Sequence, residues 1–321
     1  MRASLTHRTS ALLYDTELPN AFGMRSLKAS HLTGDQSLQF SLKDFDESLI
    51  AVLPSPFHVM VSSRDARFRR KNVVCHYQNG PLPASAFRLI GENTLVVSPE
   101  LCFAQMSSVM TRMELVKFGI ELCSTYVPHP LGESPHQSRQ PLTTVERLSN
   151  RGLSHGFGNR RKIEAALPWL IDNSASPRET ALYMLLCLPY RLGGYNLPKP
   201  IMNYEIPLNA TEARMAGKHC FRADLFWPEF NLDVEYDSSQ FHLEERRMET
   251  DAIRRNVLNH KGIRVLSVTR NQMNSMVAFD AIAQQIAQVL GKRIQVNPEQ
   301  FYDRRKRLRE VLFDCDYTHL I

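Results

Sequence analysis

The chain has 321 residues, more than the about 100 to 200 residues of a usual single domain, so two domains are expected. Hydrophobic residues make up 43% and charged residues 22%, which is typical of globular proteins and excludes the disordered and fibrous classes. No run of about 18 apolar residues is present to cross a bilayer, and the first residues lack the apolar segment of a secretory signal. We therefore expect a soluble, cytoplasmic protein with no membrane partner.

Charge and cysteine content restrict the partners only mildly. The 39 lysines and arginines exceed the 33 aspartates and glutamates, and the resulting net charge of +6 favours a polyanionic partner but is also typical of a solvated surface. The cysteines are scattered without a C-x-x-C pair, which predicts buried free thiols rather than disulfides or a zinc site. These cysteines are Cys75, Cys102, Cys123, Cys187, Cys220 and Cys315.

The first part of the chain, 1–128, is predicted to be a smaller domain of mixed α and β structure. Strands are expected over 50–61 and 72–77, and apolar residues at helical spacing predict a helix over 99–123. The following residues, 129–142, are rich in Pro, Ser, Gly and Gln. Such a composition predicts a linker.

A second domain is predicted over 143–321, and it begins with two short helices near Thr143 and over 160–171. Its core is expected over 176–291, where Ser176, Pro177 and Glu179 give an N-cap serine, a proline at N1 and a glutamate at N3. The order of elements from there is α, β, β, β, α, β, α, which predicts an α/β core with a mixed central sheet flanked by helices. After the first helix, the elements are strands over 202–206, 220–227 and 232–237, a helix over 243–259, a strand over 263–268 and a helix over 279–290.

Two of these strands are predicted to form a hairpin that gathers acidic side chains. If 228–231 is a four-residue turn, Trp227 faces Leu232, and the same register places Asp224 opposite Glu235. Because side chains alternate along a strand, further carboxylates share this face of the sheet. They are Asp233 and Asp237.

This concentration of negative charge predicts a metal site. Like charges directly opposite one another destabilise a strand pair by about 0.2 to 1 kcal/mol, and a cation compensates them. Mg²⁺ prefers carboxylate oxygens, polarises a phosphoryl group and lowers the pKa of a bound water. Two other interpretations stay open: a solvated edge strand, or structural ion pairs with basic side chains. The candidates for such pairs are Arg222, Arg246, Arg247, Arg254 and Arg255.

As a set, these residues resemble the very-short-patch-repair-like branch of the PD-(D/E)XK nuclease superfamily, over about 176–291. The resemblance implies a restriction-endonuclease-like αβββαβ core and a DNA endonuclease that depends on Mg²⁺ or Mn²⁺. It is carried by 222–228 (RADLFWP), 232–238 (LDVEYDS), Phe241 with His242, Asp251, Arg254 with Arg255, Leu258 and 261–266 (KGIRVL).

The resemblance also assigns catalytic roles to individual residues. It implies that Asp224 and Glu235 are the main metal ligands, that Glu179 completes the site, and that His242 is a general acid/base or a phosphate contact. Asp237 belongs to the implied catalytic set, although many members carry the catalytic lysine at this position. On local sequence alone, the glutamate of a capping box is the favoured interpretation of Glu179.

Two departures from the family pattern favour an alternative function. Besides the missing lysine, Ser238 replaces the usual glycine. The alternative is a catalytically inactive nuclease fold that binds DNA as a transcriptional regulator or antitoxin. In either case the resemblance implies nucleic-acid contacts at Arg222, Arg254, Arg255 and Lys261. Structural alternatives stay open for three of them. Lys261 is also placed to be a helix C-terminal cation, and Arg254 and Arg255 are placed to form ion pairs with Asp251 on one helix face.

The N-terminal part resembles AbiEi-type antitoxin and regulator proteins at 10–14 (SALLY) and 94–101 (TLVVSPEL). This similarity implies a prokaryotic phage-defence or toxin–antitoxin setting, in which the N-terminal region recognises DNA or a partner protein from the same operon. Two basic runs, 64–71 (RDARFRRK) and 304–309 (RRKRLR) on a C-terminal helix, predict further contacts with nucleic acid or solvated faces.

Overall fold

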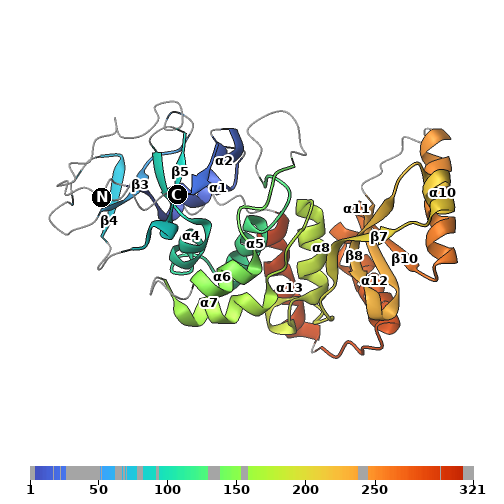
Figure 1. Ribbon diagram of the computed structural model, residues 1–321. Helices are drawn as coiled ribbons and strands as arrows, with labels where there is room; N and C mark the ends of the chain where they lie inside the picture. Colours follow the sequence, from blue (N-terminus) through green and yellow to red (C-terminus); the bar gives the residue numbers. More distant parts are fainter. Residues whose placement is uncertain are drawn as a thin grey trace. The chain divides into compact units, whose positions relative to one another are not determined.

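The computed structural model describes residues 4–16, 18–21, 23–26, 51, 53–61, 67, 69, 71–77, 82–91, 94–128, 138–152, 158–237, 245–296 and 298–313, without the side chains of 20, 152, 245–251 and 298. The chain divides into two compact units between Asp172 and Asn173 (Figure 1). Both units are mixed α/β structures in which a mixed sheet lies beside helices. In the part of the chain that is described, no helix has the length and apolar character needed to span a membrane.

The sheet of the first unit has the strand order β2-β5-β6-β1-β3-β4 among the described residues. Strands β1 and β6 run parallel, as do β3 and β4, and the remaining neighbours are antiparallel. The prediction of a strand over 72–77 is confirmed, whereas the strand predicted over 50–61 begins only at Phe57. The strands are β1 Ser4–Leu5, β2 Arg25–Ser26, β3 Phe57–Val61, β4 Val73–Tyr77, β5 Phe87–Ile90 and β6 Thr94–Val97.

The helix predicted over 99–123 is two helices. The second one begins because Thr111 and Glu114 form a capping box, in which the Glu114 carboxylate accepts from the Thr111 N–H at 2.6 Å and the Thr111 hydroxyl accepts from the Glu114 N–H at 3.3 Å. The helices of this unit are α1 His7–Tyr14, α2 Leu18–Ala21, α4 Pro99–Met106, α5 Arg112–Leu122, α6 Val145–Gly152 and α7 Arg160–Ala166, with short 3₁₀ turns η3 Ala84–Ala86 and η4 Leu167–Trp169.

The boundary between the units lies later than the predicted linker at 129–142. Residues 129–137 lie outside the described residues, but Arg139 is buried and donates to the carbonyl oxygens of Tyr14 at 2.6 Å and Glu121 at 2.7 Å. The Leu142 N–H then bonds to the carbonyl of Leu122 at 3.0 Å. This segment therefore belongs to the core of the first unit, and α6 and α7, which pack on α4 and α5, belong there too.

The second unit has a sheet with the order β10-β9-β8-β7. Strands β7, β8 and β9 are antiparallel neighbours, and β10 runs parallel to β9. The predicted strands are all present, and α9 is an addition to the predicted order. The elements are α8 Pro177–Cys187, η5 Tyr190–Leu192, β7 Ile201–Pro207, α9 Ala210–Ala216, β8 Cys220–Trp227, η6 Pro228–Phe230, β9 Leu232–Asp237, α10 Glu245–His260, β10 Arg264–Thr269, α11 Arg270–Asn274, α12 Met276–Val289 and α13 Pro298–Phe313.

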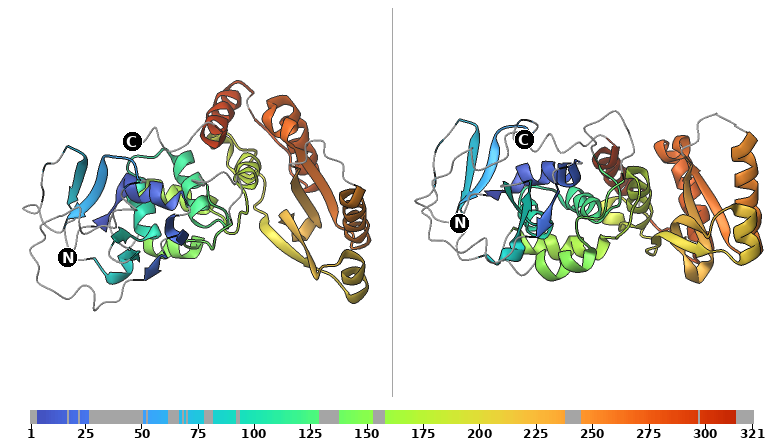
Figure 2. Two further views of the ribbon diagram at one scale, coloured as in Figure 1. Left: turned by 90° about the horizontal axis from the view of Figure 1, so that it is seen from above. Right: turned by 45° about the horizontal axis from the view of Figure 1, so that its top comes forward.

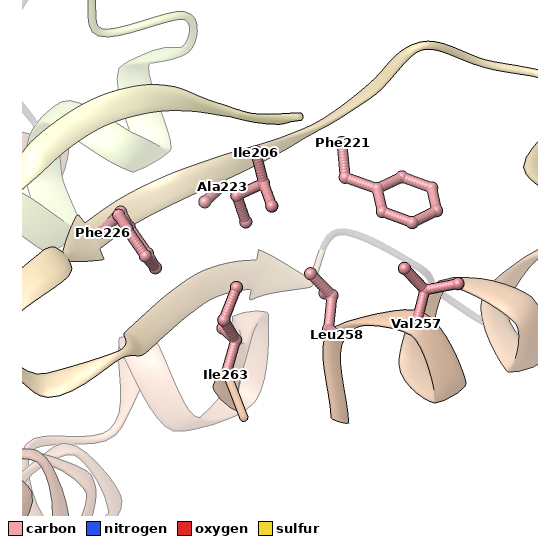
Figure 3. Packing of buried hydrophobic residues seen from close by; sticks show 7 residues of the cluster. All are labelled: Ile206, Phe221, Ala223, Phe226, Val257, Leu258 and Ile263. Atoms are coloured by element: carbon pink, nitrogen blue, oxygen red, sulfur yellow. The ribbon is translucent and has the colours of Figure 1, made fainter. Parts of the chain in front are cut away.

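Helices cover both faces of this sheet (Figure 2). Val257 and Leu258 of α10 pack into an apolar cluster with side chains of β7 and β8, as Figure 3 shows. On β10, Val265 packs against that cluster, while the alternate residues Arg264 and Leu266 line a pocket with side chains of α12. Successive residues of a strand point to opposite faces, so α10 and α12 lie on opposite sides of the sheet.

Candidate functional site

The hairpin of β8 and β9 has the predicted register. Trp227 pairs with Leu232, Phe226 with Asp233, and the ladder ends at the next pair, Leu225 with Val234. In the same register the following two residues are Asp224 and Glu235. The predicted register is thus confirmed for three pairs, and the predicted pair of Asp224 with Glu235 lies beyond the last of them.

Asp224 is the half-buried carboxylate at the centre of this site. Its Oδ2 accepts a hydrogen bond from the Tyr236 N–H at 2.9 Å, which ties β8 to β9 beyond the last strand pair. Burial, and then the negative charges of Glu179 and Glu235, raise the pKa of Asp224 to about 7, although the Tyr236 N–H and Arg254 act in the opposite direction. Three carboxylates from α8, β8 and β9 therefore act on one another electrostatically.

Glu179 joins this group from the first turn of α8. The Ser176 hydroxyl accepts from the Glu179 N–H at 3.1 Å, so the predicted N-cap is confirmed. The Glu179 carboxylate is buried, and its Oε2 accepts from the Ala175 N–H at 3.0 Å and from Asn203 Nδ2 at 2.6 Å. The reciprocal bond of a capping box is absent, because Glu179 accepts from Ala175, the residue before the N-cap, and not from the Ser176 N–H. The same carboxylate also places negative charge beside Asp224.

Glu235 has a cationic partner. Arg254 of α10 forms an ion pair with the Glu235 carboxylate, and its Nη2 lies 3.6 Å from Oδ2 of Asp233. The same guanidinium donates to the carbonyl oxygen of Arg222 at 2.8 Å and lies over the Phe221 ring, 5.0 Å from its centroid. The structural ion pair that the sequence left open is therefore present for one of the two main candidate ligands.

Asp233 is the acid whose environment the sequence did not reveal. It has no exposed surface, and neither carboxylate oxygen accepts a hydrogen bond from the described residues. Burial, followed by the neighbouring Glu235 carboxylate, raises its pKa well above the ordinary range. The folded chain therefore favours the neutral form of this acid, so the negative charge on this face comes from its neighbours.

The donor set decides which kind of metal these residues can hold. Among the described residues, no group of three His, Cys, Asp or Glu side chains has the arrangement of a metal site. A closed site with three protein ligands is therefore absent from the described part of the chain. Mg²⁺ needs less from the protein, because it usually takes one or two carboxylates and completes its shell with waters and phosphate oxygens. Asp224 and its electrostatic neighbours Glu179 and Glu235 are the candidates for these one or two carboxylates.

The remaining predicted catalytic residues are placed only in part. Asp237 is half-buried at the end of β9, where its backbone pairs with Thr269, and no lysine stands at this position. His242 lies outside the described residues, as do the side chains of Arg246, Arg247 and Asp251.

The predicted nucleic-acid contacts have different surroundings. Arg222 is exposed and lies 3.4 Å from the carboxylate of Glu205 on β7. Arg255 is exposed on α10, next to the ion-paired Arg254. Lys261 forms an ion pair with Glu212 of α9 at 3.0 Å. Arg222 and Arg255 are accessible to a ligand, whereas Lys261 fastens the end of α10 to α9, in agreement with the structural alternative for this lysine.

The basic run 304–309 lies on α13, as predicted, but its arginines do not all face solvent. Arg305 pairs with Asp280 of α12 and donates to the Tyr195 hydroxyl at 2.7 Å, and Arg309 donates to the carbonyl of Met273 at 2.7 Å. Lys306 and Arg307 are exposed. Two of the five basic residues therefore hold α13 in place, and the exposed Lys306 and Arg307 remain accessible to a phosphate.

The described cysteines carry no site of their own. No disulfide joins those at positions 75, 102, 123, 187 and 220, as predicted. Cys102, Cys123 and Cys187 are buried, as predicted, whereas Cys75 and Cys220 are half-buried, and burial raises the pKa of Cys102 to about 12.

Comparison of the chain with known proteins gave no match to a family model, a curated protein or a solved structure.

Proposed function

We propose that the second unit is a restriction-endonuclease-like nuclease domain that hydrolyses phosphodiester bonds in DNA with the help of Mg²⁺ or Mn²⁺. The observation that carries this proposal is the unrelieved charge on Asp224. Its carboxylate is half-buried, and burial followed by the charges of Glu179 and Glu235 raises its pKa to about 7, so a divalent cation is the simplest group to complete the site.

The order of elements supports the same proposal. Helix α8 is followed by the three antiparallel strands β7, β8 and β9, then by α10 and the parallel strand β10. The acidic residues come from α8 and from the region where β8 and β9 separate. This is the distribution that the resemblance to PD-(D/E)XK nucleases implies, with Glu179 on the helix and Asp224 and Glu235 on the strands.

The chemistry assigned to the residues follows from their positions. Asp224, with Glu179 or Glu235, would hold the cation, which would polarise the phosphoryl group and lower the pKa of a bound water. The exposed guanidiniums of Arg222 and Arg255 would bind neighbouring phosphates of the DNA backbone. A phage-defence or toxin–antitoxin setting, with a partner protein from the same operon, is part of the proposal because the N-terminal similarity implies it.

A plasmid cleavage assay tests the proposal. The full chain is incubated with supercoiled DNA in Mg²⁺, in Mn²⁺ or in EDTA, and we expect nicked and linear products only when a metal is added. Asp224→Asn should lower the cleavage rate by about 100-fold or more, because it removes the ionised ligand. Glu235→Gln should lower it in the same direction.

Glu229→Gln is the matched control, because Glu229 is exposed at the opposite end of the same hairpin. It should cut as the wild type does, and circular dichroism checks that every variant is folded. Metal-independent cutting, or equal activity of Asp224→Asn and the wild type, would exclude the proposed site.

A second candidate function is DNA binding without cleavage, as in a regulator or antitoxin. Two observations favour it: Arg254 already neutralises Glu235, and Asp237 stands where a catalytic lysine is expected. This candidate predicts binding to DNA in EDTA that weakens steeply with salt, and no product with any divalent metal. Fluorescence anisotropy with labelled duplex DNA, run beside the cleavage assay, distinguishes the two functions.

A further inference from the structure

Three imidazole rings meet in the first unit. His7 is the first residue of α1, His58 lies on β3 and His76 lies on the neighbouring strand β4. Nδ1 of His58 and Nε2 of His76 are 2.8 Å apart, and the ring of His7 stacks on that of His76 with 3.7 Å between centroids. The rings are brought together by the parallel pairing of β3 with β4 and by the chain passing from β1 directly into α1.

A polar network holds the His7 ring in place. The side-chain oxygen of Gln105 on α4 accepts from the Thr6 hydroxyl at 2.8 Å and from the His7 N–H at 3.1 Å. The Thr6 hydroxyl is in turn 3.1 Å from Nδ1 of His7. Among the described residues, one nitrogen of each ring then has no hydrogen-bond partner: Nε2 of His7, Nε2 of His58 and Nδ1 of His76.

Two arginines act electrostatically on this cluster. Arg8 follows His7 in the chain, and Arg67, from the basic run 64–71, lies over the ring of Tyr77, the residue after His76, at 5.7 Å from its centroid. Burial lowers the pKa of His76 to about 4, and the charges of Arg67 and Arg8 contribute to this shift. Within the described ranges, no carboxylate forms an ion pair with Arg8 or Arg67.

We propose that Arg8, His58, Arg67 and His76 form a binding site for a phosphate group in the first unit. Both guanidiniums supply permanent charge and several N–H donors. The hydrogen bond between the neutral rings of His58 and His76 uses the N–H of one ring, so the other ring supplies one N–H donor that no described residue uses. The phosphate is either that of a small molecule or part of a nucleic-acid backbone, because the chemistry of recognition is the same.

Charge separates this proposal from a metal site. Neutral imidazoles are good ligands for transition metals, but a divalent cation beside Arg8 and Arg67 would be repelled. The described residues also contain no group of three ligands arranged for a metal ion. A phosphate, in contrast, compensates two guanidiniums that have no acidic partner among the described residues.

Isothermal titration of the full chain tests the site, with inorganic phosphate in one arm and a short duplex DNA in the other, both in EDTA. Arg67→Gln and His76→Asn should each weaken binding of the recognised ligand by about tenfold, the loss of one charge-assisted hydrogen bond. Arg8→Gln serves as a further variant if His76→Asn does not fold. Arg147→Gln is the matched control, because Arg147 is an exposed arginine on α6 of the same unit, and it should bind as the wild type does.

The two arms identify the source of the phosphate. Loss of inorganic phosphate binding in the variants supports a small-molecule site, and loss confined to DNA supports a backbone contact. The proposal is overturned if neither ligand binds the wild type, or if both variants bind as tightly as it does. A thermal unfolding experiment without EDTA provides a further test. The proposal is overturned if Zn²⁺ raises the unfolding temperature of the wild type but not that of His76→Asn, and phosphate changes the unfolding temperature of neither protein. None of these outcomes depends on Asp224, so the nuclease proposal is tested separately.

Discussion

Arg254 of helix α10 donates a hydrogen bond to the carboxylate of Glu235 on strand β9. The same guanidinium lies 3.6 Å from the fully buried Asp233, so it serves two acids on one face of the sheet. Its side chain is held by the Phe221 ring and the carbonyl of Arg222, and is therefore fixed by packing as well as by charge. Arg254 therefore supplies positive charge beside the carboxylates that would also hold the proposed metal ion.

Removal of this charge should destabilise the second unit. Arg254→Gln leaves the partly buried Glu235 carboxylate without its cation and removes the packing on Phe221, which should lower the free energy of unfolding by about 1 to 3 kcal/mol. Urea denaturation monitored by Trp227 in a Trp169→Phe background reports on this unit, because the chain has two tryptophans and the other lies in the first unit.

Two variants control this experiment. Arg255→Gln neutralises the exposed neighbour on the same helix and should change stability little. Glu235→Gln combined with Arg254→Gln should recover much of the loss, because it removes the carboxylate charge that was left without a partner. Equal stability of Arg254→Gln and Arg255→Gln would contradict the assigned role.

Asp224 should make stability fall as pH rises. Its pKa in the folded chain, about 7, lies above the ordinary value of 3.8, so folding favours the protonated carboxyl. The stabilising contribution is complete below the ordinary pKa and is lost as pH rises through the folded-state value. In EDTA, Asp224→Asn should therefore be more stable than the wild type by about 1 kcal/mol or more near pH 8, and the difference should vanish near pH 4. A difference of opposite sign in urea denaturation at the higher pH would contradict this environment.

The histidine cluster should have the opposite pH dependence. Burial, and then neighbouring positive groups, lower the pKa of His7 to about 3 and that of His58 to about 4, below the ordinary value of 6.5. At acidic pH the unfolded chain binds more protons at these histidines than the folded chain does. Their stabilising contribution is therefore fully present above the ordinary pKa and is lost as pH falls towards the folded-state pKa values. The charged groups around the cluster, Arg8 and Arg67, act in the same direction as burial.

Hydrogen exchange measured by mass spectrometry on β3 and β4 checks this prediction. Lowering the pH from about 7 to about 5 should reduce the free energy of opening of these strands by roughly 1 to 2 kcal/mol, after the exchange rates are corrected for the pH dependence of intrinsic exchange. The expected effect is no larger because the partly exposed imidazoles are screened by solvent. His219→Asn, at an exposed histidine of the second unit, should leave the pH dependence unchanged, whereas His58→Asn should weaken it. Unchanged protection of the wild type across this range would contradict neutral imidazoles in the cluster.

A side chain at position 193 should be destabilising, because Gly193 lies in close contact with α13. Gly193 has a φ of 84°, and a Cβ at this position would lie 2.4 Å from the carbonyl oxygen of Arg304. Gly193→Ala should therefore lower the free energy of unfolding by about 2 to 4 kcal/mol, because the helix must move away. Gly217→Ala is the control for backbone strain alone, since Gly217 has a φ of 62° and open space around it, and it should cost about 1 kcal/mol. Equal losses in urea denaturation would show that contact with α13 is unimportant.

Local sequence patterns predicted most helices and strands of the second unit, because capping and turn residues mark where these elements begin and end. Ser176 with Pro177 fixed the start of α8, and the turn before Leu232 fixed the register of the hairpin. Helix α9 was missed although Asn209 and Glu212 form a capping box there, because its seven residues are too short for a periodic pattern.

The fold of the first unit was harder to predict because long-range contacts decide it. Arg139 lies in a segment whose composition is typical of a linker, yet its guanidinium is buried on the carbonyls of Tyr14 and Glu121. Composition does not reveal such a partner, which is distant in sequence and is created only by folding. The split between α4 and α5 was visible in principle, since Thr111 and Glu114 have the spacing of a capping box.

The candidate site was predictable in its acids but not in its cation. Alternation along β9 placed Asp233 and Glu235 on one face, and the turn placed Asp224 near them. Which of five nearby arginines would reach Glu235 depends on the rotation of α10 against the sheet, and that rotation is set by the packing of Val257 and Leu258. Tertiary packing therefore supplied the information that the local pattern lacked.

Binding of Mn²⁺ to the full chain, followed by electron paramagnetic resonance, tests the central claim most directly. The wild type should bind Mn²⁺ with a dissociation constant below about 1 mM, and Asp224→Asn should weaken this binding by about tenfold or more, while Glu229→Gln should not change it. Equal affinity of Asp224→Asn and the wild type, or no binding by either, would contradict a metal site at these carboxylates.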